Sequence, residues 1–94
     1  MKPRGLSLGM SVQTDNRTGN IVAVYFQVRI GKAAHVEELA GGDAFANYNA
    51  KGELLGVELL GPCNLSVLDK IARKDSAPVA NFFRQSVPRQ MALA

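Results

Sequence analysis

The sequence predicts an α+β domain, an antiparallel β-meander of about five strands followed by two short C-terminal helices. In residues 6–61, apolar and polar side chains alternate along short runs that are separated by glycine, asparagine and aspartate. Beyond Gly61-Pro62, apolar residues recur every three or four positions, as on a helix face. A chain of 94 residues fits one domain, 1–94, with the meander at 6–61 and a helical tail at 64–88.

The first two strands are predicted to form a hairpin. Residues 8–14 alternate, and the turn-forming residues 15–20 follow them. In residues 21–30 one face is uniformly apolar and is assigned to the core: Val22, Val24, Phe26, Val28 and Ile30. Tyr25 makes the opposite face partly apolar, which indicates cover by a helix or by a second subunit. This second possibility suggests a dimer.

Three further strands are predicted before the tail. Residues 34–39 form a strand with Val36 inward and its acidic side chains outward, and residues 43–48 form one in which Phe45 and Tyr48 carry most of the apolar area. The turn at 49–52 then leads into residues 53–60. There one face is shared by Leu55, Val57 and Leu59, and the other carries Leu54, Gly56, Glu58 and Leu60. Gly56 in this strand marks a β-bulge or a close approach of another backbone.

The tail is predicted to contain two amphipathic helices. The first begins after an N-cap at Asn64 or Ser66, and its apolar stripe consists of Leu65, Leu68, Ile71 and Ala72. The second begins after Ser76, tolerates Pro78 in its first turn and ends before Pro88. Its apolar stripe consists of Val79, Phe82, Phe83 and Val87. Residues 89–94 are too few to assign.

Three segments, 15–20, 31–39 and 48–60, resemble the small bacterial domain of unknown function family 2283. The resemblance covers roughly residues 12–62, and its most specific part is the run Lys-Gly-Glu-Leu-Leu-Gly-Val-Glu-Leu-Leu at 51–60. The family usually carries acidic residues where this chain has Asn47 and Asn49, and the tail is additional to the family pattern. The resemblance implies a compact meander without an established activity, and an antitoxin-like role as the protective partner of a small toxin.

The sequence predicts no enzyme, cofactor or metal site. His35 is the only histidine and Cys63 the only cysteine, so a zinc site or a nucleophilic pair would rest on these two residues alone. Adjacent Glu37 and Glu38 point to opposite faces of a strand and cannot chelate one cation together. The glycines do not have the spacing of a phosphate-binding loop.

Composition restricts the compartment and the partners. The longest apolar run, residues 21–26, is far shorter than the roughly 20 residues of a membrane span, so no membrane contact is expected and a cytoplasmic location is predicted. A single cysteine allows no intramolecular disulfide. The net charge of +3 lies entirely in residues 61–94, because the first 60 residues balance.

Two functional hypotheses follow. The first is a self-associating protein-interaction module, a homodimer or the partner of another protein, whose contact residues are Val79, Phe82, Phe83, Leu68 and Tyr25. The alternative is nucleic-acid binding through the basic residues of the tail: Lys70, Arg73, Lys74 and Arg84. The position of Phe82 and Phe83 distinguishes the two hypotheses. Burial against a second chain favours the first, whereas a tail packed on its own sheet with a free basic face favours the second.

Overall fold

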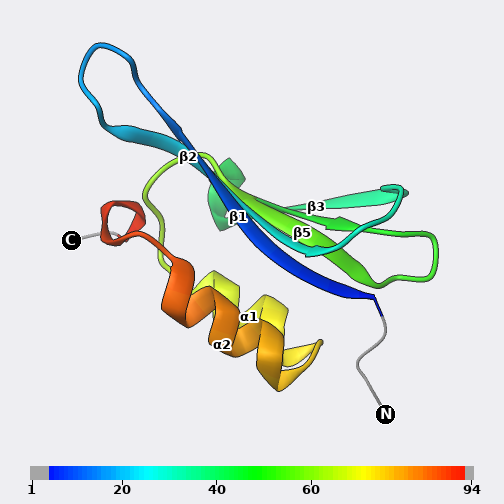
Figure 1. Cartoon of the computed structure of the whole chain (residues 1–94). Helices are drawn as coiled ribbons and strands as arrows, with labels where there is room; N and C mark the ends of the chain where they lie inside the picture. Colours follow the sequence, from blue (N-terminus) through cyan, green and yellow to red (C-terminus); the bar gives the residue numbers. More distant parts are fainter. Residues whose placement is uncertain (1–4, 93–94) are drawn as a thin grey trace.

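The computed structural model describes residues 5–92, which form one antiparallel sheet of five strands with two helices on one of its faces (Figure 1). The predicted α+β fold class is confirmed. The elements in chain order are β1 (Leu6–Thr14), β2 (Ile21–Arg29), β3 (His35–Leu39), the 3-10 turn η1 (Ala40–Gly42), β4 (Ala44–Tyr48), β5 (Leu54–Leu59), α1 (Ser66–Arg73), α2 (Ala77–Ser86) and the 3-10 turn η2 (Arg89–Met91).

The strand order is β1-β2-β5-β4-β3, which differs from the sequential order of a meander. The segment after β2 crosses to the far edge of the sheet before β3 begins, and β5 later fills the central position between β2 and β4. Five of the six residues of β5 are buried, whereas β3 contains none. The most apolar strand therefore occupies the centre, where both of its sides are paired, and the short charged strand lies at an edge.

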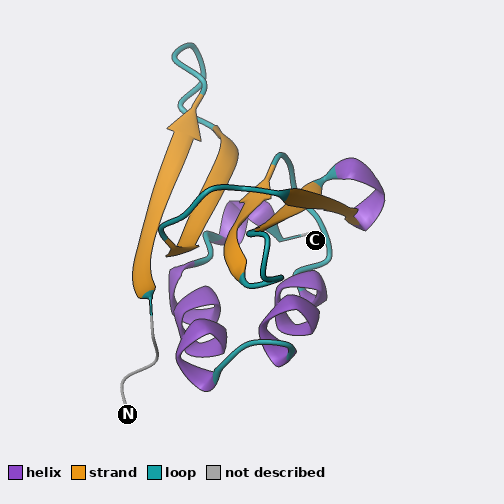
Figure 2. Ribbon diagram, turned by 90° about the vertical axis from the view of Figure 1, so that its right-hand side faces the viewer, coloured by secondary structure: helices purple, strands orange, loops and turns teal. Residues whose placement is uncertain are grey.

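The β1–β2 hairpin extends beyond the rest of the sheet. β5 pairs with β2 only over Val24–Gln27, so the turn end of the hairpin projects past the helix layer (Figures 1 and 2). The predicted turn is confirmed: the Asp15 carboxylate accepts hydrogen bonds from the backbone N–H groups of Arg17 at 2.7 Å and Thr18 at 3.2 Å. The projection accounts for a longest dimension of 44 Å.

The tail helices complete the core of their own sheet. The ring of Phe83 is 1 % exposed and lies 5.2 Å, centroid to centroid, from the ring of Phe26. Phe82 is half-buried and packs edge-to-face on the same Phe26 ring at 5.9 Å. Met91, in the segment left unassigned from the sequence, is also fully buried. The remaining buried apolar residues are Val24, Val28, Ala44, Ala46, Leu54, Leu55, Val57, Leu59, Cys63, Val67, Leu68, Ile71, Ala72 and Val79.

Two residues assigned to the core of β2 are exposed, Val22 by 40 % and Ile30 by 80 %. Pairing moves from Gln13–Ala23 to Thr14–Ile21, so Val22 is the extra residue of a β-bulge. The bulge reverses the alternation, and Ile21 packs against the core instead. Ile30 lies beyond the end of the strand. The core assignment was wrong for these two residues and correct for the three between them.

The core-facing residues of β3 and β4, at the other edge of the sheet, were also predicted incorrectly. Val36 is 53 % exposed, while Leu39 packs against the core. In β4 the core face carries Ala44 and Ala46, both fully buried, and the alternation places Phe45 on the opposite face. These small side chains were overlooked because the prediction weighted apolar area, whereas alanines allow the helix layer to approach the sheet closely.

The prediction for Gly56 is confirmed. Asn47 pairs with Gly56 and Tyr48 with Leu54, so Leu55 is the extra residue of a bulge, and Leu54 instead of Leu55 shares the core face with Val57 and Leu59. A Cβ at Gly56 would overlap the Tyr25 hydroxyl and would lie 2.6 Å from a main-chain carbonyl of β2. The Tyr25 ring thus packs directly over this glycine.

The helix boundaries agree with the capping pattern. Ser76 is the N-cap of α2, proline occupies the first turn, and the helix ends before Pro88. For α1 the N-cap position is Leu65, one residue from each predicted candidate. The Asn64 side chain nevertheless accepts a hydrogen bond from the Ser66 N–H at 3.0 Å and so satisfies one free donor at this helix start.

Candidate interaction surfaces

The first candidate surface is the outer edge of β1, which is the end strand of the sheet. Leu8, Met10 and Val12 alternate along it, and each is 42 % exposed. These three residues are called the edge stripe below. The strand Leu6–Thr14 contains neither a charged residue nor a proline. An edge strand of this kind offers unpaired backbone groups and apolar side chains to another strand.

The edge stripe continues the surface of the core. Met10 pairs with Phe26 and Val12 with Val24, so the stripe lies on the face of the sheet that carries the helices. Phe82 of α2 packs on the same Phe26 ring and is only half-buried. Leu6 packs against the core, whereas the stripe residues nearer the projecting turn remain about half-exposed. The helix layer therefore covers β1 incompletely.

The residues predicted to mediate self-association do not form one surface. Val79, Phe83 and Leu68 are at most 3 % exposed and belong to the core of their own chain. Phe82 lies on the helix face beside the edge stripe. Tyr25 lies on the opposite face of the sheet, between Ser11 of β1 and Glu58 of β5. Of the predicted set, only Phe82 adjoins the edge stripe, and the sequence periodicity did not distinguish it from its buried neighbour.

The second candidate surface is a groove of about 360 Å³ between α1 and the β3–β4 edge of the sheet, called the α1 groove below. Its apolar floor is formed by Leu39, Tyr48, Val67 and Ile71. Its charged lining consists of Lys70 and Arg73 from α1, Lys74 at the C-cap of that helix, and Glu37 from β3. Burial raises the pKa of Tyr48, and the nearby Glu37 carboxylate raises it further, so the Tyr48 phenol stays protonated at neutral pH.

The structure brings together three of the four basic residues proposed for nucleic-acid binding. Lys70, Arg73 and Lys74 are exposed along the α1 groove. Across residues 5–92, none of the three forms an ion pair with an acidic side chain. Arg84 is exposed on α2, and its Nε atom lies 3.6 Å from the Asp69 carboxylate. This exposed pair reduces the net positive charge around the fourth basic residue.

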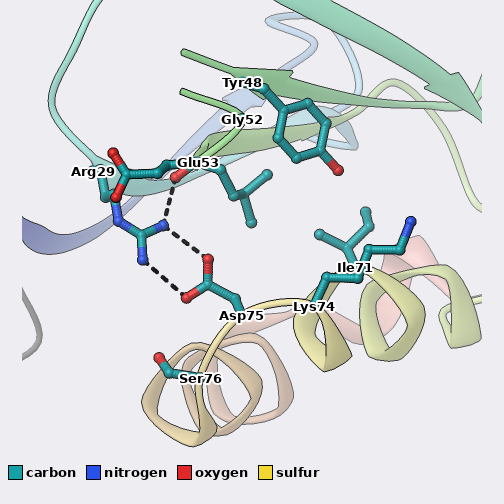
Figure 3. A pocket seen from close by; sticks show the side chains of 9 residues that line it. Arg29, Tyr48, Gly52, Glu53, Ile71, Lys74, Asp75 and Ser76 are labelled. Carbon is teal, nitrogen blue, oxygen red and sulfur yellow. Dashed lines mark hydrogen bonds and ion pairs between the residues drawn. The ribbon is translucent and has the colours of Figure 1, made fainter. Parts of the chain in front are cut away.

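A neighbouring cavity of about 400 Å³ contains a charged pair that sequence reasoning missed (Figure 3). Arg29, at the end of β2, donates two hydrogen bonds to Asp75 in the turn between the helices, at 2.8 and 3.0 Å. The same guanidinium donates to the Leu54 carbonyl at 2.9 Å. The side chains are 14 % and 8 % exposed. Burial alone would raise the pKa of Asp75, but the hydrogen bonds and charge of Arg29 hold it below its ordinary value.

His35 and Cys63 occupy different parts of the fold. His35 lies against the Tyr48 ring, with centroids 5.9 Å apart, at one end of the β3–β4 pair. Cys63 is 2 % exposed, and burial raises its pKa, with a further contribution from Asp43 at the other end of that pair. The length of β4 separates the two ends by on the order of 15 Å. Within residues 5–92, no group of three His, Cys, Asp or Glu side chains could hold a metal ion.

No protein-family model matches the chain, and comparisons with curated proteins and with solved structures found no match either. The resemblance to family 2283 therefore stays a prediction. Neither helix in the part of the chain that the structure describes is long and apolar enough to cross a membrane.

Proposed function

We propose that this protein is a self-associating interaction module in which two copies pair through their β1 edges. The observation that carries the proposal is an edge strand of nine residues without charge or proline that bears the half-exposed edge stripe. Soluble proteins protect such edges with lysine, proline, a β-bulge or a covering element, because bare edges pair with other strands. β1 has a bulge between Leu6 and Gly9, so its regular edge, open to another strand, is Gly9–Thr14. Pairing with a second copy supplies that protection.

The sequence of β1 is self-complementary in an antiparallel arrangement. Met10 is the central residue of Leu6–Thr14, so a two-fold axis at Met10 pairs Gly9–Ser11 regularly with its copy and places residues 12–14 opposite the bulged segment 6–8. Leu8 then faces Val12 of the second copy, and Met10 of one copy faces Met10 of the other. Directly opposed residues share a face in antiparallel pairs, so both edge stripes meet on the helix side of one continuous sheet. No like charges face each other in this register.

The expected affinity is modest. Full burial of a large apolar side chain contributes about 1.5–3 kcal/mol, so burying the exposed part of both edge stripes contributes about 4–8 kcal/mol. Association costs at least about 4 kcal/mol in translational and rotational freedom. The main-chain hydrogen bonds between the two β1 strands add to the favourable free energy from burial of the edge stripes. Burial less the cost of association leaves at most about 4 kcal/mol, a millimolar dissociation constant, and several ladder hydrogen bonds at about 1 kcal/mol each lower it to the micromolar range that the assay must cover.

The position of the tail bears on both hypotheses drawn from the sequence, self-association through the tail and nucleic-acid binding. The tail packs on its own sheet, which removes the reason to expect tail-mediated pairing. Its basic groups are largely free, and this arrangement counts in favour of nucleic-acid binding. However, Arg84 is paired with Asp69, and Lys70 and Lys74 line a groove with an apolar floor. Phosphate contacts of nucleic-acid-binding proteins usually come from a broader basic surface. These features favour edge pairing over nucleic-acid binding as the function.

The test is the solution mass by light scattering from about 1 to 500 µM, a range chosen around the micromolar affinity expected above. Wild type is expected to pass from monomer to dimer, and Met10→Lys to remain monomeric, because it places two like charges opposite each other. The matched control is Val36→Lys, an exposed apolar residue of the opposite edge strand, which should behave as wild type. A wild type that is monomeric throughout, or a dimer lost only in the control, would overturn the proposal.

A further inference from the structure

We infer that the α1 groove binds a small organic anion, a molecule with one negatively charged group on an apolar body. This inference is independent of edge pairing, because the groove lies beside β3 and β4 at the opposite side of the sheet from β1. It rests on three observations: the volume of the groove, the composition of its floor and the charge along its rim.

The volume and floor suit the apolar body of such a ligand. The groove of about 360 Å³ lies within the range of about 300–1,000 Å³ that small-molecule sites occupy. Val67 and Ile71 supply one wall from α1, and Leu39 and Tyr48 supply the other from the sheet. Small-molecule sites typically combine such an apolar lining with a few polar groups that fix orientation.

The rim supplies the positive charge. Lys70 and Ile71 follow Val67 by three and four positions, and Lys74 follows Lys70 by four and Ile71 by three, so both lysines lie on the helix face that forms the groove. Arg73 adds a third cation, against the single carboxylate of Glu37. Because the three cations form no ion pair with the described acidic residues, the groove carries an unbalanced positive charge. An anionic group can lie here without displacing an existing partner.

The α1 groove extends into the cavity beside it. Tyr48, Ile71 and Lys74 line both spaces, so the α1 groove continues past Lys74 towards Arg29 and Asp75 (Figure 3). In this view the Tyr48 hydroxyl points towards the helix layer. Arg29 is neutralised by Asp75, and the Glu53 carboxylate, which also lines this cavity, makes that end net negative. The anionic group is therefore expected between Lys70 and Lys74, with the apolar body over Tyr48 and Ile71.

The test uses three probes followed by amide chemical shifts in solution: octanoate, acetate and octanol. Octanoate has both the charge and the apolar body, acetate lacks the body, and octanol lacks the charge. Saturable shifts confined to α1, β3 and β4 are expected with octanoate, with at least tenfold weaker binding of acetate and octanol. The double variant Lys70→Gln/Lys74→Gln is expected to weaken octanoate binding at least tenfold.

The matched control is Lys32→Gln/Lys51→Gln, which removes the same charge from two exposed turn positions outside the groove. It should change octanoate affinity less than twofold. Equal weakening by both double variants, equal binding of acetate, or shifts centred on the edge stripe would overturn the inference. Displacement of octanoate by a short thymidine oligonucleotide at lower concentration would also overturn it, because the lysines would then form a phosphate-backbone site.

Discussion

Replacing Asp75 by alanine should remove a large part of the stability of this fold. The substitution leaves the Arg29 guanidinium, 14 % exposed, with the Leu54 carbonyl as its remaining hydrogen-bond acceptor. Removing one partner of a buried ion pair costs about 3–5 kcal/mol, because the other charge stays buried without compensation. A domain of 94 residues has a total stability of about 5–14 kcal/mol. Asp75→Ala should therefore remove at least about a fifth of this stability.

Urea unfolding followed by circular dichroism measures this loss. The matched control is Asp69→Ala, which breaks the exposed pair with Arg84 and should cost no more than about 1 kcal/mol. The two variants delete the same carboxylate from neighbouring parts of the tail, so their difference isolates the effect of burial. The combined change Arg29→Met/Asp75→Leu should recover most of the stability, since it leaves no buried charge. Equal losses for Asp75→Ala and Asp69→Ala would refute the reasoning.

Three further predictions concern the same fold. Because the pKa of Asp75 is lowered on folding, its stabilising contribution is complete above its unfolded value of about 4 and is lost as the pH falls through the folded value. Unfolding titrations below pH 4 should therefore show a steeper loss for wild type than for Asp75→Ala, and parallel curves would contradict this. Gly56→Ala should cost about 1–3 kcal/mol in urea unfolding. Adding Tyr25→Ala should restore only part of it, because the clash with the β2 carbonyl remains; full recovery would contradict the geometry. Phe83→Ala should cost about 3–5 kcal/mol and Phe82→Ala clearly less, as measured by thermal or urea unfolding. The reverse order would show that the tail is not docked on its sheet as described.

The sequence predicted the elements well because their signals are local. Alternation gives strands, a three-to-four spacing gives helices, and the glycine-bearing turns separate them. The errors in assigning faces have one main cause. A bulge shifts the alternation by one residue, so Val22 and Leu55 exchange places with their neighbours Ile21 and Leu54. The position of a bulge depends on pairing with another strand, and the pattern of one strand alone does not reveal it.

The strand order and the candidate surfaces depend on contacts between distant residues. The runs 34–39 and 53–60 both satisfy the same local strand pattern, and only the greater apolar content of 53–60 favours it for the central place beside β2. The Arg29–Asp75 pair joins residues 46 positions apart and had no sequence signal beyond the presence of the two charges. The lysines of α1 were identified from the sequence, but the apolar floor beside them appeared only with the fold. For that reason Lys70 and Lys74, first proposed to bind nucleic acid, are now proposed to bind a small organic anion.

The hairpin provides a further argument for edge pairing. The helix layer lies towards the Leu6 end of β1, and the turn end projects beyond it (Figures 1 and 2). A two-fold axis at Met10 reverses the second strand, so the Leu6 end of one copy lies beside the Thr14 end of the other. The helix layer of each copy then lies beside the turn end of the other copy's hairpin, which is the part that the other copy's own helices leave uncovered. Val12, 42 % exposed in the single chain, should consequently be protected on dimerisation. Hydrogen exchange at the amides of residues 10–14 should slow with protein concentration in wild type and not in Met10→Lys.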